Sequence, residues 1–267
     1  MKSPVAETSV TRFPDGEHLD DVVATEEPLQ ILIDNRPIAV LMRTPGHDRS
    51  LVAGFLLSEG VIDGPDDLKR ITPCPNPDRE DRHNLCLVHL AEGCAPPDKV
   101  FERLSYASTS CGVCGKTSID NLLARCDPFN AATPLPRALV AEAGERALAS
   151  QTIFRATGGI HAAALLDLET FEVKGFAEDV GRHNAIDKVT GQALLDDRLP
   201  LARHALWVSG RASFEVVQKA LSAGIPALIC VGAPTSLAVE LARTCNLTLV
   251  GFARTPERFN VYAGEVV

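Results

Sequence analysis

The sequence predicts an α/β protein with a largely parallel sheet in its C-terminal half and a smaller α+β domain before it. From residue 160 onward, short apolar runs alternate with segments of helical periodicity, a pattern typical of a sheet covered on both faces. The run 227–231 is apolar throughout, as in strands buried on both sides. The length of 267 residues exceeds what one hydrophobic core usually needs, which favours two domains or one large one.

Composition narrows the class of protein. The chain is 45% hydrophobic and 23% charged, with a net charge of −9, which argues against a general nucleic-acid or membrane-surface binder. No apolar run approaches a bilayer span, and the polar start of the chain has no signal core. We therefore expect a cytoplasmic protein whose eight cysteines are mostly reduced and available for metal or sulfur chemistry.

The first 105 residues divide into an arm and a small domain. Residues 1–25 are polar and acidic without apolar periodicity, so we expect a mobile or loosely docked arm. Within the α+β domain predicted for 26–105, runs 29–33 and 38–42 indicate a hairpin, and Asp48 is a helix cap for a helix ending near Gly60. A charged connector is expected at 62–71, an exposed loop at 73–84 and a strand at 85–90.

Residues 106–267 form the predicted second domain. Helical periodicity predicts helices at 137–150, 183–195, 213–223 and 235–244. Apolar runs predict a hairpin of strands 160–166 and 171–176, followed by strands at 205–208, 227–231, 247–252 and 260–262. A two-cysteine loop stands at the start of this domain.

That loop, residues 110–116, carries the clearest chemical signal. Cys111 and Cys114 are flanked by glycines and precede a predicted helix with Thr117 as its cap. A helix N-terminus and the cation of Lys116 stabilise a thiolate, which is the form of cysteine that attacks sulfur. Two other interpretations stay open. The pair could be structural, or it could be half of a zinc site completed by two of Cys74, Cys86 and Cys94.

Polar residues follow three of the predicted parallel strands. Ser209, Gly210 and Arg211 follow the first, 232–236 follow the second, and Ala253 and Arg254 follow the third. Ligands of such sheets bind beyond the carboxyl ends of the strands, and hydroxyls, an arginine fork and helix N-termini suit phosphate. Each segment alone could equally be an ordinary helix cap or loop.

Two further stretches combine charges with imidazoles. Residues 178–188 surround His183 with acids and bases at a helix start, which suits a ligand or a proton carrier. The alternative is a salt-bridged cap with a partly exposed histidine. His161 follows a glycine pair and precedes a strand; a satisfied core histidine is as good an interpretation.

Several motifs together resemble the formate dehydrogenase accessory sulfurtransferase family. The resemblance covers residues 26–262, leaves out the N-terminal arm, and rests on these stretches: TPGHD, GFLLSEGVI, SCGVCGK, TGGIHAAAL, EDVGRHNAIDK, SGRASFEVVQKA, APTSLAVELA and LVGFAR. It implies a small N-terminal domain and a C-terminal domain similar to cytidine deaminase.

The resemblance also implies a function. Members accept persulfide sulfur from a cysteine desulfurase and pass it to the molybdenum bis(guanine dinucleotide) cofactor, a bound substrate rather than a resident metal, for the formate dehydrogenase catalytic subunit. A homodimer is implied, without nucleic-acid or membrane partners. Carried over by position, the persulfide cysteine is Cys111 and the second loop cysteine is Cys114. The cofactor-binding stretch comprises Phe252, Ala253, Arg254, Thr255, Pro256 and Glu257.

Three functions of other classes remain as alternatives. A zinc deaminase requires H-x-E before P-C-x-x-C, yet His161 is followed by alanines and comes after the cysteines, and Ser110 replaces the proline. A thiol-disulfide oxidoreductase would cycle Cys111 and Cys114 without a large cofactor. A non-enzymatic chaperone would bind the cofactor or its target enzyme without needing Cys111.

Overall fold

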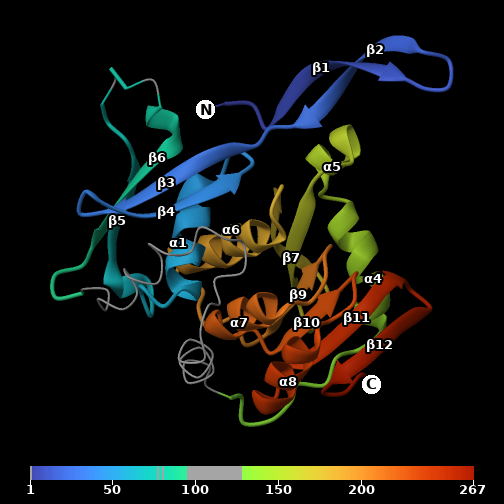
Figure 1. The fold of residues 1–267 in the computed structure, drawn as a ribbon. Helices are drawn as coiled ribbons and strands as arrows, with labels where there is room; N and C mark the ends of the chain where they lie inside the picture. Colours follow the sequence, from blue (N-terminus) through green and yellow to red (C-terminus); the bar gives the residue numbers. More distant parts are fainter. Residues whose placement is uncertain (1, 77, 80, 95–127) are drawn as a thin grey trace.

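The computed structural model describes residues 2–76, 78–79, 81–94 and 128–267 (Figure 1). The two-cysteine loop with Cys111 and Cys114, the helix expected after Thr117 and the domain boundary at 105 lie outside the described residues. These three expectations therefore stay predictions.

A six-stranded sheet organises the C-terminal part. Its order is β12-β11-β10-β9-β7-β8, built from β7 (His161–Asp167), β8 (Val173–Asp179), β9 (His204–Val208), β10 (Ala227–Cys230), β11 (Thr248–Thr255) and β12 (Arg258–Ala263). Strands β9, β10 and β11 run parallel to one another. The other pairs are antiparallel: β7 with both β8 and β9, and β12 with β11. The expectation of a largely parallel sheet is thus corrected to a mixed one. Buried apolar strands look alike in either direction.

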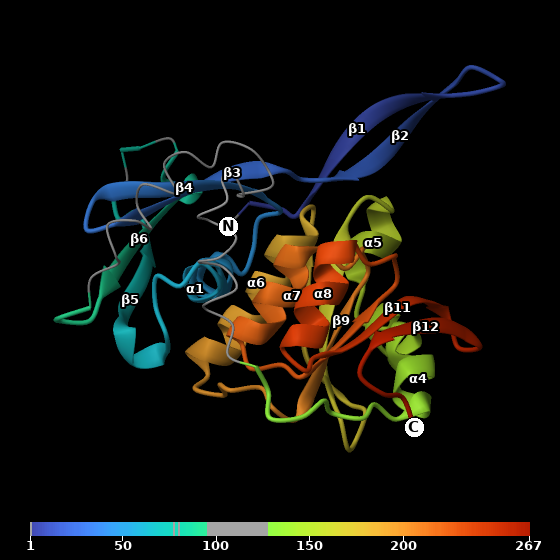
Figure 2. The same ribbon diagram turned by 60° about the horizontal axis from the view of Figure 1, so that its bottom comes forward.

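Helices cover both faces of this sheet, as predicted (Figure 2). One face carries α6 (Arg182–Leu195), α7 (Phe214–Ser222) and α8 (Ser236–Thr244), and the other carries α4 (Arg137–Leu148). Alternate strand residues separate the two cores: Ala163 and Leu165 face the α6 side, whereas Ala162 and Ala164 face the α4 side. The short helix α5 (Thr152–Thr157) was not predicted.

A second sheet forms the N-terminal part. Its order is β4-β3-β6-β5, from β3 (Glu27–Ile33), β4 (Arg36–Arg43), β5 (Leu68–Pro73) and β6 (Leu85–Leu90). The predicted hairpin is confirmed; Asp34 and Asn35 make its turn at positive φ. The connector expected at 62–71 instead contains a 3₁₀ turn (Pro65–Asp67) and the start of β5, in which Ile71 is the buried residue. Because Ile71 is a single buried residue among charged ones, the segment has no apolar alternation from which a strand could be predicted.

Helix α1 (Asp48–Ser58) joins the two parts. It packs between the N-terminal sheet and α6 (Figure 1), with His47 rather than Asp48 as its N-cap. A Cβ on Gly54 would overlap the Asp187 carbonyl, and one on Gly191 would overlap that of Ser50. The two helix backbones therefore touch, and one continuous hydrophobic core runs through both parts.

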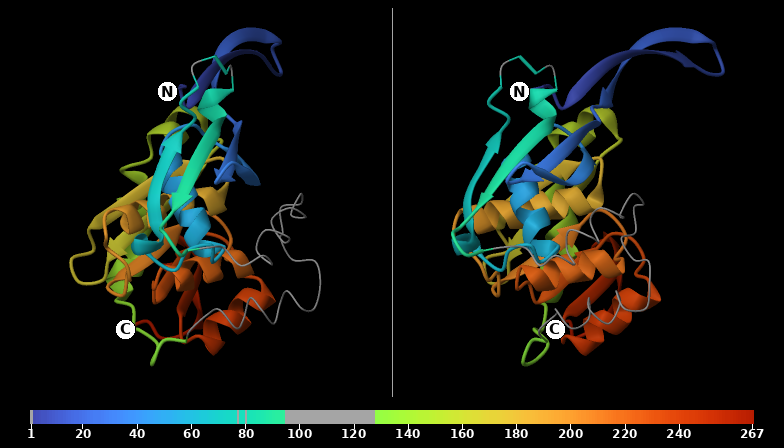
Figure 3. Two further views of the ribbon diagram at one scale, coloured as in Figure 1. Left: turned by 90° about the vertical axis from the view of Figure 1, so that its left-hand side faces the viewer. Right: turned by 60° about the vertical axis from the view of Figure 1, so that its left-hand side comes forward.

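The N-terminal arm forms a two-stranded hairpin, β1 (Val5–Arg12) and β2 (Glu17–Ala24), that extends away from the body (Figure 3). These strands were not predicted, because neither face of the hairpin is buried and no apolar alternation is therefore required. The hairpin contacts α5 through β2. None of the helices in the described ranges is both long and apolar enough to span a bilayer.

Candidate functional site

The polar segments predicted to share an edge of the sheet do so. The parallel register of β9, β10 and β11 brings their carboxyl ends to one edge, and antiparallel pairing places the start of β7 and the end of β8 at the same edge. Ser209, Gly232 and Arg254 are therefore near neighbours in space although they come from three strands. His161, at the start of β7, joins them.

A cavity of about 480 Å³ opens at this edge, on the α4 side of the sheet. Three predicted site residues line it: Ser209, Ala253 and Arg254. The remaining walls come from α4, from the segment around α5, and from the strand ends. Its volume lies within the usual range of small-molecule sites.

Two buried polar atoms beside this cavity have no hydrogen-bond partner among the described residues, namely Trp207 Nε1 and Gln151 Oε1. Both side chains line the cavity and both residues are only 2% exposed. A buried polar group without a partner is costly, so an indole donor and an amide acceptor at one cavity indicate a ligand that supplies the complementary groups. Sequence reasoning missed both residues. The available signal was the single tryptophan of the chain, two positions before Ser209.

His161 and Ser209 form the polar floor of the cavity. The Ser209 Oγ accepts from the Ala162 backbone N–H at 2.9 Å and lies 3.2 Å from His161 Nδ1. Burial, followed by the nearby charge of Arg182, lowers the pKa of His161. A neutral imidazole has one donor and one acceptor nitrogen, so both interpretations of His161, a ligand contact and a core residue, stay open.

Six other predicted site residues do not line this cavity. Gly210 is buried against the Arg182 side chain, and Arg211 is exposed beside Gly232. Phe252 is 40% exposed and holds a left-handed backbone with φ of 56°, a conformation that costs free energy in a non-glycine residue. Thr255, Pro256 and Glu257 are exposed at the β11–β12 turn. All six remain close to the edge that carries the cavity.

The charged stretch 178–188 is largely structural. Asp179 pairs with Lys188 at 2.7 Å and accepts from the backbone N–H of Thr44, and Asn184 donates to Asp179 and to the Met42 carbonyl. These bonds tie the end of β4 to the start of α6. Glu178 accepts from the first three N–H groups of α5, as a carboxylate at a helix N-terminus does.

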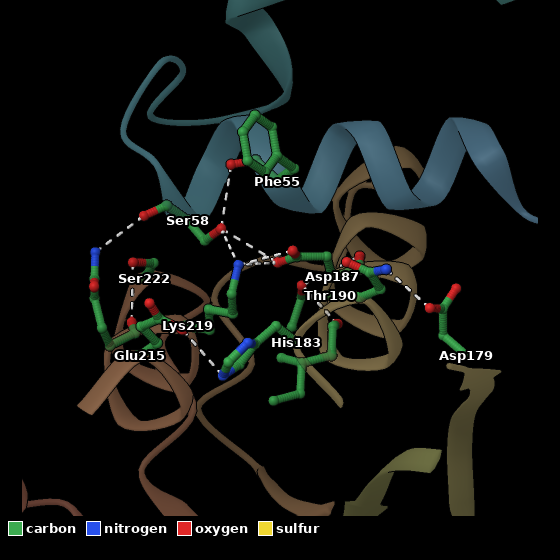
Figure 4. Close-up of polar contacts among 12 residues, drawn as sticks. Phe55, Ser58, Asp179, His183, Asp187, Thr190, Glu215, Lys219 and Ser222 are labelled. Atoms are coloured by element: carbon green, nitrogen blue, oxygen red, sulfur yellow. Dashed lines mark hydrogen bonds and ion pairs between the residues drawn. The ribbon is translucent and has the colours of Figure 1, made fainter. Parts of the chain in front are cut away.

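The same stretch supplies a second buried ion pair (Figure 4). Lys219 on α7 donates to both Asp187 carboxylate oxygens, at 2.8 and 2.7 Å, and to Ser58 Oγ on α1 at 2.8 Å. Burial raises the pKa of Asp187 to about 6, against the opposing effect of Lys219. The pair links three helices from both parts of the chain.

Two members of this stretch have a side-chain nitrogen without a partner among the described residues: the buried Arg182 Nε and His183 Nδ1. The His183 Nε2 lies 3.1 Å from Glu215 Oε2 (Figure 4). The same atom lies 3.3 Å from Ser213 Oγ. Burial, then the charges of Arg182 and Lys219, lower the pKa of His183 to about 3, so the imidazole is neutral and donates from Nε2. The geometry supports the cap interpretation, and Nδ1 is left available as an acceptor.

Two of the described cysteines, Cys86 and Cys230, are buried thiols. Burial raises the pKa of Cys86 to about 12 and also raises that of Cys230. Within residues 2–76, 78–79, 81–94 and 128–267, no three His, Cys, Asp or Glu side chains gather as a metal site would require. The zinc interpretation needs only two ligands from this part of the chain, because its other two, Cys111 and Cys114, lie outside the described residues, so it stays open.

Comparison with known proteins gives concordant matches. The FdhD/NarQ family model matches residues 24–266. A protein of Streptomyces avermitilis named sulfur carrier protein FdhD is 48% identical over 263 residues, covering 96% of this chain and 93% of that protein. The protein of the same name from Anaeromyxobacter dehalogenans is 47% identical over 268 residues, covering 97% and 92%.

A solved structure agrees with these relatives. The crystal structure described as a candidate formate dehydrogenase accessory protein of Desulfotalea psychrophila superposes with a TM-score of 0.73 at 28% identity, and covers 97% of this chain and 96% of that one. The match extends over both sheets and is not confined to the C-terminal part. Taken with the family model and the full-length relatives, it shows that this chain belongs to the FdhD/NarQ family.

Proposed function

We propose that this protein is a sulfur carrier for formate dehydrogenase, which takes persulfide sulfur from a cysteine desulfurase and transfers it to the molybdenum bis(guanine dinucleotide) cofactor. The names of its full-length relatives support the sulfur-carrier role. A cytoplasmic location, a homodimer and contact with the formate dehydrogenase catalytic subunit belong to the proposal as expectations from the family resemblance.

One observation carries the choice of acceptor: the unpartnered Trp207 Nε1 and Gln151 Oε1 line one cavity together with Arg254. A guanine base presents a carbonyl acceptor and an exocyclic amino donor, which match the indole donor and the amide acceptor. Arg254 at the mouth suits the adjoining phosphate, and Ser209, Gly210 and Arg211 continue the same edge. The cavity volume of about 480 Å³ suits one nucleotide end of the cofactor.

Cys111 is the proposed acceptor of sulfur. Its thiolate attacks the outer sulfur of the desulfurase persulfide; a new S–S bond forms on Cys111, the donor S–S bond breaks, and the donor cysteine leaves as a thiolate. Cys114 assists release by attacking the inner sulfur of Cys111, which expels the outer sulfur as hydrosulfide and leaves a Cys111–Cys114 disulfide. A dithiol reductant of the cell then restores both thiols.

Calorimetry with guanosine diphosphate tests whether the cavity binds the nucleotide end of the cofactor that accepts the sulfur. Arg254→Ala should weaken binding by about 1.5 to 3 kcal/mol, the range for a hydrogen bond to a charged group. Arg211→Ala should weaken it less, because Arg211 does not line the cavity, whereas Arg254 does. Arg203→Ala removes an exposed arginine that precedes β9 at the opposite edge and serves as the matched control. Equal affinities in the wild type and the Arg254 variant would remove this cavity from the proposal.

Maturation of formate dehydrogenase in cells separates the alternatives. Cys111→Ser should abolish maturation while the protein still folds and still binds guanosine diphosphate. A binding-only chaperone predicts wild-type maturation in that variant. A thiol-disulfide oxidoreductase predicts an equal requirement for Cys111 and Cys114 and no nucleotide binding in any variant.

A further inference from the structure

A second cavity, of about 720 Å³, lies between the N-terminal sheet, the start of α1 and the C-terminal end of α6. It shares no lining residue with the nucleotide cavity. Leu29, Leu85 and Leu195 supply apolar walls, and charged side chains gather at one corner. A mostly apolar cavity with a few convergent polar groups is the usual form of a small-molecule site.

The charged corner contains a buried arginine, Arg43, with one nitrogen that donates no hydrogen bond to the described residues. Arg43 is 1% exposed and donates from Nε and Nη2 to the two Asp48 oxygens, at 3.0 and 3.1 Å. Its Nη1 has no hydrogen-bond partner among the described residues, and neither has the buried Glu27 Oε2. These two atoms form an ion pair at 3.6 Å, a distance too long for a hydrogen bond. A donor and an acceptor are thus left side by side at the cavity.

The N-terminus of α1 faces the same corner. His47 holds a left-handed conformation as N-cap and gives no side-chain cap bond. The residues of the first turn, 48–50, line the cavity, and their backbone N–H groups have no acceptor among the described residues. Uncapped N–H groups and the positive end of the helix dipole favour a carboxylate or another anion there.

From these contacts we propose that this cavity is a second ligand site, which binds a small zwitterion of the α-amino acid type. The carboxylate accepts from Arg43 Nη1 and the α1 N–H groups, the ammonium donates to Glu27 Oε2, and the side chain lies on the leucine walls. A simple anion would face the carboxylates of Glu27 and Asp48, and a simple cation would face Arg43 and Lys2, whose Nζ already donates to Glu27 Oε1 at 2.6 Å. The 3.6 Å separation of donor and acceptor matches two charged groups on one α-carbon.

Binding of individual amino acids to the intact protein, measured by calorimetry and thermal shift, tests the site. At least one free amino acid should bind, and its N-acetyl and amide derivatives, which each remove one charge, should bind about 10-fold more weakly or worse. Glu27→Gln should weaken binding of the free amino acid to the same degree. Leu195→Trp, which fills the cavity from a partly exposed position, should abolish binding.

Arg254→Ala, in the other cavity, is the matched control and should leave amino acid binding unchanged. Guanosine diphosphate binding by the Glu27 and Leu195 variants verifies that they fold. No binding by the wild type at about 10 mM, a concentration that would saturate a ligand with a Kd of ~1 mM, would overturn the site and leave a bridging water as the partner of Arg43 and Glu27. Equal affinity for free and N-acetyl forms would also overturn it.

Discussion

Buried ion pairs on one face of the six-stranded sheet and buried neutral side chains on the other differ in how completely they are bonded. On the α6 side, Asp179 pairs with Lys188, and Asp187 pairs with Lys219, each with further hydrogen bonds. Arg182 Nε, at the start of α6, is an exception and has no partner among the described residues. On the α4 side, Trp207 Nε1 and Gln151 Oε1 have none among the described residues. Complete bonding fits a structural role and incomplete bonding fits ligand recognition.

The largest expected effect on stability comes from breaking a buried ion pair on the α6 side. Asp187→Asn should lower the free energy of unfolding by about 3 to 5 kcal/mol, because it leaves the buried Lys219 cation without its counter-charge. Urea denaturation measures this loss. Asp81→Asn, in the exposed pair with Arg79, is the matched control and should leave the free energy of unfolding nearly unchanged. Similar losses in both variants would contradict a structural role for the buried pair.

The contact between α1 and α6 is the next most sensitive feature. Gly191→Ala places a Cβ on the Ser50 carbonyl oxygen, so the helices must separate, at a cost of about 1 to 3 kcal/mol or more. Gly159→Ala, where the nearest atom would be 3.8 Å from the new Cβ, should be tolerated. If the denaturant unfolding curves of the two variants coincide, α1 and α6 can move apart without cost, and the close contact is not required for stability.

On the α4 side, where polar groups lack partners, removing such a group should weaken ligand binding without lowering the free energy of unfolding. Gln151→Met exchanges a buried amide, whose Oε1 has no described partner, for an apolar side chain of similar size, so it should leave the free energy of unfolding unchanged or raise it. The same change should weaken guanosine diphosphate binding about 10-fold. Parallel calorimetry and denaturation distinguish the two effects. Lost stability with unchanged binding would assign the Gln151 amide to the fold.

The smallest expected effect concerns pH. The pKa of His183 is lowered to about 3 from its ordinary 6.5, so between these values the unfolded chain binds a proton that the folded chain does not. This contribution to stability is therefore present above pH 6.5 and falls as the pH drops toward 3, by about 1 kcal/mol at pH 5.5. His183→Gln should remove that part of the pH slope. Identical slopes would mean that the folded imidazole is protonated, as an ion pair with Glu215.

Local pattern predicted most of the fold because its elements have one buried face or clear caps. The helix beginning near Asp48 and the runs at 205–208 and 227–231 correspond to α1, β9 and β10. Strand direction was not predictable, since β7 is buried on both faces whether parallel or antiparallel. The exposed hairpin at 5–24 gave no signal because it buries no face.

The site was predictable only in part. Glycines, hydroxyls and arginines after strands pointed to Ser209 and Arg254, which do line the cavity. Trp207 and Gln151 could not be found this way, because their significance comes from missing partners, and those are visible only once the chain is folded. Residues 178–188 looked functional because charges at a helix start resemble a site, yet their partners lie on β4, α1 and α7.

The most direct test of sulfur transfer is intact-protein mass spectrometry after incubation with a cysteine desulfurase and cysteine. The wild type and Cys114→Ser should gain sulfur that a reductant removes, whereas Cys111→Ser should gain none. A gain of sulfur that persists in Cys111→Ser would contradict the proposed acceptor. No gain in any sample, with a desulfurase shown to be active, would contradict sulfur transfer itself.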